Sequence, residues 1–462
     1  MMPTTADDVL YSKPRKTIRL LRRVTICSKA LSSRGASRIC TFMYHVRDLQ
    51  INKGTSRLHV WQHGATPPST TPMRVDLRQL YRLYRTPPNF MFKASLLRLV
   101  NMSGLPRVRV LGSGFLACSN KVECVNLSGM TSLRKLESNV CFSCRSLTSI
   151  NLSGLVHLEE IGVRFLQCSS ALTSIDLSGM HGLKNIGSFA LANCTALTSV
   201  NFSGLAHVEE IGDAMLLDCT ALQSLDLRGM TSLRKMGKAV FAGCSALTLV
   251  ILLDLSCLED IGERFMEGCV ALRSMDFGSM PRLNSIGRHA FMRCRALTTV
   301  NFSGLSHLAE IKTGFMMECI ALRSIDLSGL TGLRKIGAVA FSDCWSLTSI
   351  NLSGLSRVTC IEPLFLVRCN ALQHVDLRDM GSLRLIGNRA FQESTSILSI
   401  NLSGLAQLEE IGERFMQGCT GLRAVQAGGL TSLRLLRPGA FKGCIRHEAL
   451  RDTLQAALEK IT

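Results

Sequence analysis

The chain has 462 residues, of which 46% are hydrophobic and 19% charged, so it has ample material for a buried core. Only 5% of the residues are aromatic, and the core is therefore expected to consist mainly of Leu, Ile, Val, Met and Phe. The net charge of +19 is concentrated in residues 1–100, where 18 Lys and Arg stand against four acidic residues. This distribution excludes a uniformly basic protein.

No run of about 18 apolar residues occurs, so no membrane-spanning helix is expected. The first 30 residues are interrupted by Arg and Lys and contain no apolar core of a secretory signal. Their Arg-rich composition leaves an organelle transit peptide as an alternative, but Asp7 and Asp8 favour a disordered basic tail. We therefore predict a cytoplasmic location, with the cell surface as the alternative if an export signal is missing.

Residues 1–93 are predicted to form a basic, largely irregular or disordered N-terminal region. Its segment 65–72, ATPPSTTP, has the composition of a linker. VDLRQLYRLY at 75–84 predicts a short helix that begins at Asp76 and leads to a first strand near 96–100. The basic side chains of this region are a candidate site for binding nucleic acid or an acidic surface, although the region has no RNA-binding signature.

From Asn101 to Leu450 the sequence divides into fourteen units of 25 residues, and LTSINLSGL occurs both at 147–155 and at 347–355. If Asn101 is position 1 of its unit, apolar residues recur at positions 2, 5, 8, 11, 15, 16, 19, 22 and 25. The alternation at positions 25, 1 and 2 predicts a strand, and Ser-Gly predicts a turn. Positions 15, 16 and 19 predict one inward-facing helical turn.

One such unit buries too few side chains to fold alone, so the units must stack and cover one another. The sequence therefore predicts an α/β solenoid of about fourteen 25-residue coils over residues 94–450, with a parallel β-sheet on one face and short helical turns on the other. Residues 451–462 are predicted to form a C-terminal capping helix, because apolar residues recur there at helical spacing.

Neighbouring units differ in a regular way. One type has a large residue at position 15, as in Phe265–Met266, and the other mostly has Ala followed by Phe, as in Ala290–Phe291. Positions 9 and 10 alternate in charge, for example Glu159–Glu160 against Arg134–Lys135. The first alternation predicts large side chains stacked on small ones, and the second predicts a ladder of opposite charges that fixes register.

The phrases C-x-x-L-T-S-I-D-L and L-x-x-I-G-x-x-A-F-x-x-C resemble the BspA-type leucine-rich repeats of bacterial and protist proteins. The resemblance covers about three quarters of the chain. It implies a leucine-rich-repeat (LRR) solenoid with a protein- or surface-binding role and without catalysis.

Thirteen of the 19 cysteines fall at position 19 or one residue before it, and Ser394 occupies the same place in another unit. Neighbouring members are expected about 5 Å apart, which would permit disulfides, but buried free thiols acting as small hydrophobic side chains are the preferred interpretation. The pair Cys141 and Cys144 is interpreted as core, since a metal site needs a second pair.

No catalytic motif and no metal-ligand or cofactor motif occurs, so an enzyme, a metal site and a cofactor are not expected. Outward-facing small polar residues instead predict an open binding face with a polar concave-face column, and simple solvation of most of these side chains is the alternative. Its candidate members are Asp176, Asn201, Asp226, Asp276, Asn301, Asp326 and Asn351.

One unit breaks this polar pattern. In LTLVILLDL (247–255), Leu249, Ile251 and Leu253 replace the outward Ser, Asn and Ser. These three side chains are a candidate protein-contact patch, and repeat decay with local rearrangement is the alternative.

These observations together predict a scaffold that binds an unknown protein partner through the open face of the solenoid. A surface adhesin or antigen-like protein is the first alternative. A nucleic-acid-associated protein acting through its basic N-terminus is the second.

Overall fold

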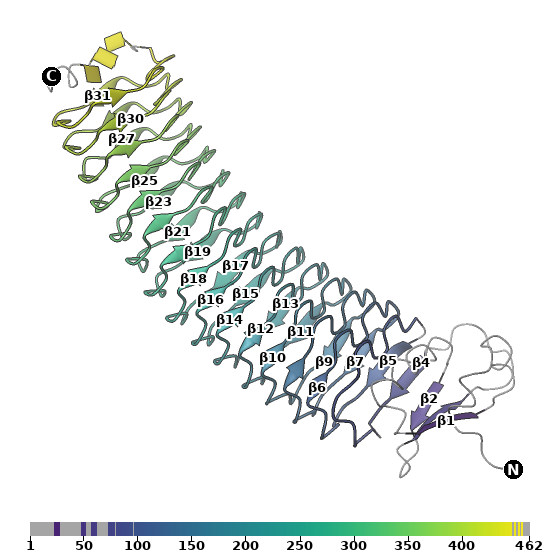
Figure 1. Ribbon diagram of the computed structural model, residues 1–462. Helices are drawn as coiled ribbons and strands as arrows, with labels where there is room; N and C mark the ends of the chain where they lie inside the picture. The colour runs from purple at the N-terminus through teal and green to yellow at the C-terminus, as the bar shows by residue number, and fades with distance from the viewer. Residues whose placement is uncertain are drawn as a thin grey trace, which may run out of the picture. The chain divides into compact units, whose positions relative to one another are not determined.

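A computed structural model describes residues 23–27, 48–51, 57–61, 73–78, 80–95, 97–445, 448–449, 451–452 and 454–455. The chain divides into two compact units, Met1–Val208 and Glu209–Thr462. The repeats form a parallel β-solenoid of about 14 coils at a spacing of about 25 residues, which confirms the predicted solenoid (Figure 1).

Each coil contributes one strand to a front sheet and a two-residue strand to a second sheet. In the first unit the front strands pair in parallel as β5–β7–β9 and β11–β13, and the second sheet has the order β6–β8–β10–β12. The front strands are β5 (Leu97–Asn101), β7 (Cys124–Asn126), β9 (Ser149–Asn151), β11 (Ser174–Asp176) and β13 (Ser199–Asn201). The second-sheet strands are β6 (Val110–Leu111), β8 (Lys135–Leu136), β10 (Glu160–Ile161) and β12 (Asn185–Ile186).

The second unit repeats this plan. Its front strands pair as β15–β17, β19–β21, β23–β25 and β27–β29–β31. They are β15 (Ser224–Asp226), β17 (Leu249–Ile251), β19 (Ser274–Asp276), β21 (Thr299–Asn301), β23 (Ser324–Asp326), β25 (Ser349–Asn351), β27 (His374–Asp376), β29 (Ser399–Asn401) and β31 (Ala424–Gln426). The second-sheet strands are β14 (Glu210–Ile211), β16 (Lys235–Met236), β18 (Asp260–Ile261), β20 (Ser285–Ile286), β22 (Glu310–Ile311), β24 (Lys335–Ile336), β26 (Cys360–Ile361), β28 (Leu385–Ile386), β30 (Glu410–Ile411) and β32 (Leu435–Leu436).

The core lies between the two sheets and the wall that joins them. Most residues at the predicted apolar positions are buried, and equivalent residues stack in register, as Val375 does on Ile400. The alternation at positions 15 and 16 produces a ladder of phenylalanine rings in the second unit. Phe291, for example, meets Phe265 and Phe315 edge to face at centroid distances of 5.6 and 6.1 Å. Large side chains of one column therefore contact large side chains of the neighbouring column, which adds aromatic contacts to simple volume matching.

The wall that joins the two sheets, at positions 13–18 of each coil, consists of turns and contains little helix. The prediction of helical turns there was wrong. Residues at positions 14, 16 and 18 have left-handed backbone conformations, as in Arg164, Leu166 and Cys168 with φ of 61°, 56° and 61°. This alternation aims successive N–H groups at opposite neighbours: Arg164 N donates to Ser188 O, and Leu166 N donates to Val140 O. The groups that a helix would pair within one turn are paired between coils instead.

One further coil precedes the predicted boundary at residue 94. The segment 75–84 is not the predicted helix, because β4 (Met73–Asp76) pairs in parallel with β5 and is followed by turns. Leu77, Leu80 and Phe90 are buried at the places that positions 2, 5 and 15 occupy in later coils. The apolar spacing that suggested a helix is thus the repeat spacing itself.

Ahead of this coil, β1 (Arg23–Cys27) and β2 (Asp48–Ile51) both pair antiparallel with β3 (Arg57–Trp61), within the region predicted as irregular. β2 also pairs in parallel with β4 through Leu49 and Val75. The predicted linker 65–72 and most of the basic tail lie outside the described residues.

At the other end, residues 448–449, 451–452 and 454–455 have helical backbone, and Leu454 is buried. The remainder of the predicted capping helix, residue 453 and residues 456–462, lies outside the described residues. The part of the chain that the structure describes has no helix long and apolar enough to cross a membrane.

The predicted charge ladder on the second sheet is confirmed within each unit. In the first unit Arg134 pairs with Glu159, and Lys135 Nζ lies 2.6 Å from Glu160 Oε2. In the second unit Lys235 lies 3.6 Å from Glu210. Because these groups are about half exposed, each pair contributes a few tenths of a kcal/mol, and their main effect is to oppose a one-coil slip.

Candidate functional site

The predicted polar column lies on the front face, defined here as the outward side chains of the front strands and of position 3. Its members face one another in register, Asp176 with Asn201, Asp276 with Asn301 and Asp326 with Asn351. Asp226 is the exception, because its partner in register is Ile251. The structure therefore places all seven predicted residues at equivalent sites within their own units.

Most of this column is occupied by internal hydrogen bonds. The Oδ1 atom of each residue accepts a hydrogen bond from the backbone N–H two residues later, as in Ser178 N to Asp176 (2.9 Å) and Ser328 N to Asp326 (3.0 Å). Sequence reasoning weighed binding against simple solvation for these side chains and missed their role in ending the strand. The N-x-S spacing was the available signal, since Asn and Asp favour this turn.

Asp and Asn also bond to each other between strands in the second unit. Asn301 Nδ2 donates to Asp276 Oδ1 at 2.8 Å, and Asn351 Nδ2 donates to Asp326 Oδ1 at 2.9 Å. Hydrogen bonds from Ser328 hold the pKa of Asp326 below its usual range, so this carboxylate is charged at neutral pH. Polar groups paired in this way have little left for a ligand.

Asp226 is paired differently. The Arg228 side chain donates to both of its carboxylate oxygens, with Nε 3.1 Å from Oδ1 and Nη2 2.7 Å from Oδ2. The same contact lowers the pKa of Asp226 and raises that of Arg228. This closed ion pair lies directly beside the candidate apolar patch.

The candidate apolar patch points outward from β17 as predicted. The exposed fractions of Leu249 and Leu253 are 51% and 46%, while Ile251 is half-buried. Asp254 follows them with φ of 70°, at a place where most other coils have Gly. Two exposed leucines in one coil are unusual on a face that is otherwise lined mainly by Ser, Asn, Asp and other polar residues.

The cysteine column is a structural feature. The 17 cysteines from Cys118 to Cys444 are free thiols, and no group of three His, Cys, Asp or Glu among the described residues could hold a metal ion. Position-19 thiols donate to the carbonyl of position 16 in the preceding coil, for example Cys244 Sγ to Leu216 O at 3.2 Å and Cys344 Sγ to Met316 O at 3.4 Å. Burial raises the pKa of both thiols to about 12.

Serine performs the same task in three coils. Ser119, Ser169 and Ser394 are buried and donate to the equivalent carbonyls at 2.8, 3.2 and 2.8 Å. Cys118 and Cys168, one residue before this position, are only partly buried, so they are not members of the column. The exchange of Cys for Ser shows that the column requires a small hydrogen-bond donor as well as a space-filling side chain.

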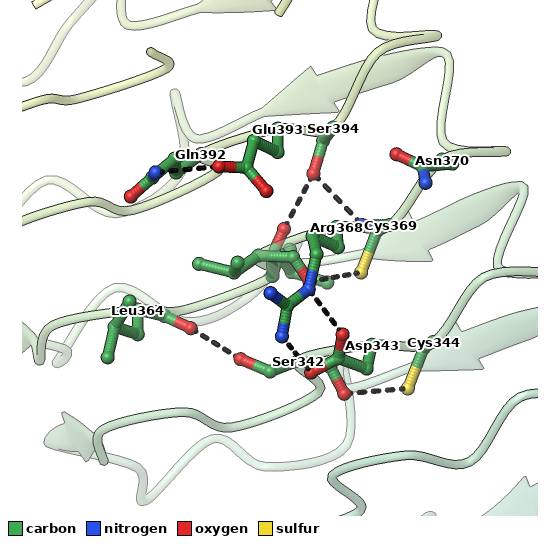
Figure 2. A network of polar contacts seen from close by, with 12 residues as sticks. Ser342, Asp343, Cys344, Leu364, Arg368, Cys369, Asn370, Gln392, Glu393 and Ser394 are labelled. Atoms are coloured by element: carbon green, nitrogen blue, oxygen red, sulfur yellow. Dashed lines mark hydrogen bonds and ion pairs between the residues drawn. The ribbon is translucent and has the colours of Figure 1, made fainter. Parts of the chain in front are cut away.

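A second group of charged residues lies on the wall of the second unit, and sequence reasoning missed it. Figure 2 shows the Arg368 guanidinium against Asp343, with Nε 2.5 Å from Oδ1 and Nη2 3.0 Å from Oδ2. In the same column Glu318 contacts Arg293 and Arg295 at 3.3 and 3.5 Å. The repeated charges at position 18 were the available signal, and their pairing points to a structural role.

Replacing Arg368 by Met should destabilise the protein by about 2–3 kcal/mol, because it leaves the carboxylate of Asp343, whose side chain is 9% exposed, without its cation. Urea unfolding of Arg368→Met measures the loss. Arg293→Met is the matched control: its partner Glu318 is more exposed and keeps Arg295, so a change below about 1 kcal/mol is expected. Equal losses in the two variants would contradict the assigned difference in burial.

Comparison with known proteins identifies the repeat. The model of the BspA type Leucine rich repeat region matches residues 89–181, 111–248, 159–298, 209–333 and 309–448. The chain belongs to the BspA-type leucine-rich repeat family. The expectation drawn from the repeat phrases is thereby confirmed, and repeats of this family are typically non-catalytic. No curated protein matches the sequence.

Several solved structures are similar to this BspA-type chain. A leucine-rich repeat protein from Bacteroides ovatus is 19% identical over 90% of this chain and 96% of its own, with a TM-score of 0.48. A leucine rich cell surface protein from Faecalibacterium prausnitzii is 18% identical over 72% and 83%, with a TM-score of 0.38. The pneumococcal vaccine antigen PcpA is 18% identical over 61% and 68%, with a TM-score of 0.28. Likenesses of this size do not transfer the function of those proteins.

Proposed function

We propose that this BspA-type protein is a non-catalytic scaffold that binds a protein partner through Leu249, Ile251 and Leu253 on the front face of the second unit. One observation carries the proposal: a single coil exchanges three outward polar residues for apolar ones and keeps two of them about half exposed. An apolar side chain of a partner that covers them would remove this surface from water.

The backbone of this coil supports binding over repeat decay with rearrangement. β17 keeps its parallel register with β15, and Leu227 N donates to Ile251 O at 3.0 Å as equivalent groups do in other coils. The inward residues Leu247, Leu252 and Leu255 remain buried. Only the outward side chains depart from the repeat.

This departure has a local cost. Ile251 has no side-chain oxygen for the turn that Asn and Asp form elsewhere, and such a hydrogen bond contributes about 1 kcal/mol. Asp254 adopts positive φ without the freedom of Gly, at a cost of about 1 kcal/mol. Residues that lower the stability of the fold at one place on its surface are typical of a functional site.

The triple variant Leu249→Ser, Ile251→Asn, Leu253→Ser restores the outward polar residues of the repeat and tests the proposal. We expect it to lose partner capture and to be as stable as the wild type or more so, by about 1 kcal/mol. Affinity capture with the full chain, followed by mass spectrometry and by thermal melting of both proteins, measures the two effects. If both proteins retain the same partners, the patch has no binding role.

The location of this binding is also a proposal. We place it in the cytoplasm, with the cell surface as the alternative, and protease protection of intact cells separates the two. The nucleic-acid alternative depends on the basic residues near the N-terminus, most of which lie outside the described residues.

A further inference from the structure

The front face of the first unit contains a hollow of about 520 Å³ over β5, β7, β9 and the start of the next coil. Three asparagines from consecutive coils, Asn101, Asn126 and Asn151, line it, and Asp176 lines it at the end formed by the next coil. Strand pairing sets the asparagines in register, Asn101 with Asn126 and Asn126 with Asn151. Asn101 and Asn126 are half-buried, and Asn151 is exposed.

The orientation of the three amides is fixed. Each Oδ1 accepts a hydrogen bond of 3.0 Å from the backbone N–H two residues later, that of Ser103, Ser128 or Ser153. An amide whose oxygen is held in this way presents its NH₂ group on the other side. Within the described part of the chain, no hydrogen bond uses these three Nδ2 groups.

In the second unit, equivalent asparagines have a carboxylate as hydrogen-bond acceptor, which the asparagines of the hollow lack among the residues described. There, each Asn of the pairs 276/301 and 326/351 donates its NH₂ group to the Asp of the preceding coil, at 2.8 and 2.9 Å. The first unit has Asn at three successive places, so no carboxylate stands between the donors. Its hollow therefore offers a row of hydrogen-bond donors spaced by the distance between neighbouring strands.

In the part of the chain that the structure describes, Asp176 lacks the kind of side-chain partner that the other aspartates at position 1 have. Asp76, Asp226 and Asp376 have an Arg two residues later as a partner, while Asp276 and Asp326 have an Asn. Among the described residues Asp176 has neither. Its Oδ1 accepts from Ser178 N, and its carboxylate remains exposed at the end of the hollow.

We propose that this hollow binds an extended, basic polypeptide segment. Main-chain or side-chain amide oxygens of the segment accept hydrogen bonds from the NH₂ groups of Asn101, Asn126 and Asn151, and a Lys or Arg of the segment pairs with Asp176. A carboxylate- or phosphate-rich ligand is disfavoured by Asp176, the only charged side chain of the lining. A sugar ring would find no aromatic side chain to stack on in that lining.

This site uses other residues than the proposed partner patch, so either can fail without the other. The test uses the full-length chain and a random dodecapeptide library displayed on phage. We expect enriched peptides to contain Lys or Arg, and we measure their affinity as synthetic fluorescent peptides by anisotropy. A library without binders, or with acidic binders, overturns the proposal.

Two variants locate the binding. Asn126→Ile removes the central donor and copies a residue that the fold already accepts at Ile251, and Asp176→Asn removes the carboxylate. Each is expected to weaken peptide binding at least tenfold. Asn351→Ile and Asp326→Asn make the same changes in the second unit and are expected to leave peptide binding unchanged. Equal effects in both units, measured on variants with native melting curves, also overturn the proposal.

Discussion

Stability of the protein is expected to fall steeply between pH 9 and pH 12, because the position-19 thiols are neutral in the folded state and ionise on unfolding. Burial raises the pKa of Cys194, Cys244 and Cys344 to about 12, from 9.0 in an exposed thiol. A folded-state pKa above the unfolded value means that the contribution is fully present below pH 9 and is lost as the pH rises toward 12. At pH 10.5 each such thiol costs about 2 kcal/mol.

Substitution by serine isolates this effect. Cys244→Ser and Cys344→Ser keep a donor for the same carbonyl, as Ser119, Ser169 and Ser394 do in their coils. We expect the double variant to match the wild type within about 1 kcal/mol at pH 7 and to exceed it by about 3–4 kcal/mol at pH 10.5. Urea unfolding at both pH values gives the two differences. If wild type and variant lose stability in parallel, ionisation of Lys and Tyr accounts for the loss and the thiol assignment fails.

Replacing a phenylalanine of the aromatic ladder by alanine is expected to cause the second large loss of stability. Phe291 is fully buried and contacts the rings of Phe265, Phe277 and Phe315 at 5.6, 5.7 and 6.1 Å. Phe291→Ala removes these contacts and leaves a cavity that the stacked coils on both sides cannot close, so a loss of about 3–5 kcal/mol is expected. Denaturant unfolding followed by circular dichroism measures it.

Phe291→Leu provides the graded comparison. Position 16 carries Leu or Met in alternate coils, such as Leu216 and Met316, so the backbone there accepts a non-aromatic residue. The variant should lose less than about 1.5 kcal/mol. A loss as large as that of Phe291→Ala would show that ring contacts, and not the filled volume, dominate this part of the core.

The repeat period made the core and its register predictable. Apolar residues at fixed positions of a 25-residue unit have no other way to leave water than to stack, and the structure buries them in register. The second-sheet charge ladder followed from the same argument. The outward position of Leu249 and Leu253 followed from strand alternation alone, because successive side chains of a strand point to opposite sides.

Other features were not predictable in this way. The helical turn expected at positions 15, 16 and 19 is absent because backbone N–H groups there bond to both neighbouring coils, a choice that depends on partners about 25 residues away. The coil that contains Leu77 and Phe90 was missed because its sequence lacks the Ser-Gly turn that marks the others. Asp343 and Arg368 were missed because the charges that recur at position 18 reveal their pairing only once the coils are stacked.

The sequence by itself therefore determined the family, the spacing of the coils and which side chains are buried, since these follow from a strict apolar period. Only the tertiary structure decided which polar side chains are already paired and which remain open to a ligand. The physical reason is that a hydrogen bond needs both the right direction and a partner at a set distance. Burial of an apolar side chain needs only that it points to the inside of the coil. For that reason Asn301 and Asn151, which begin nearly identical phrases, differ in what they can bind.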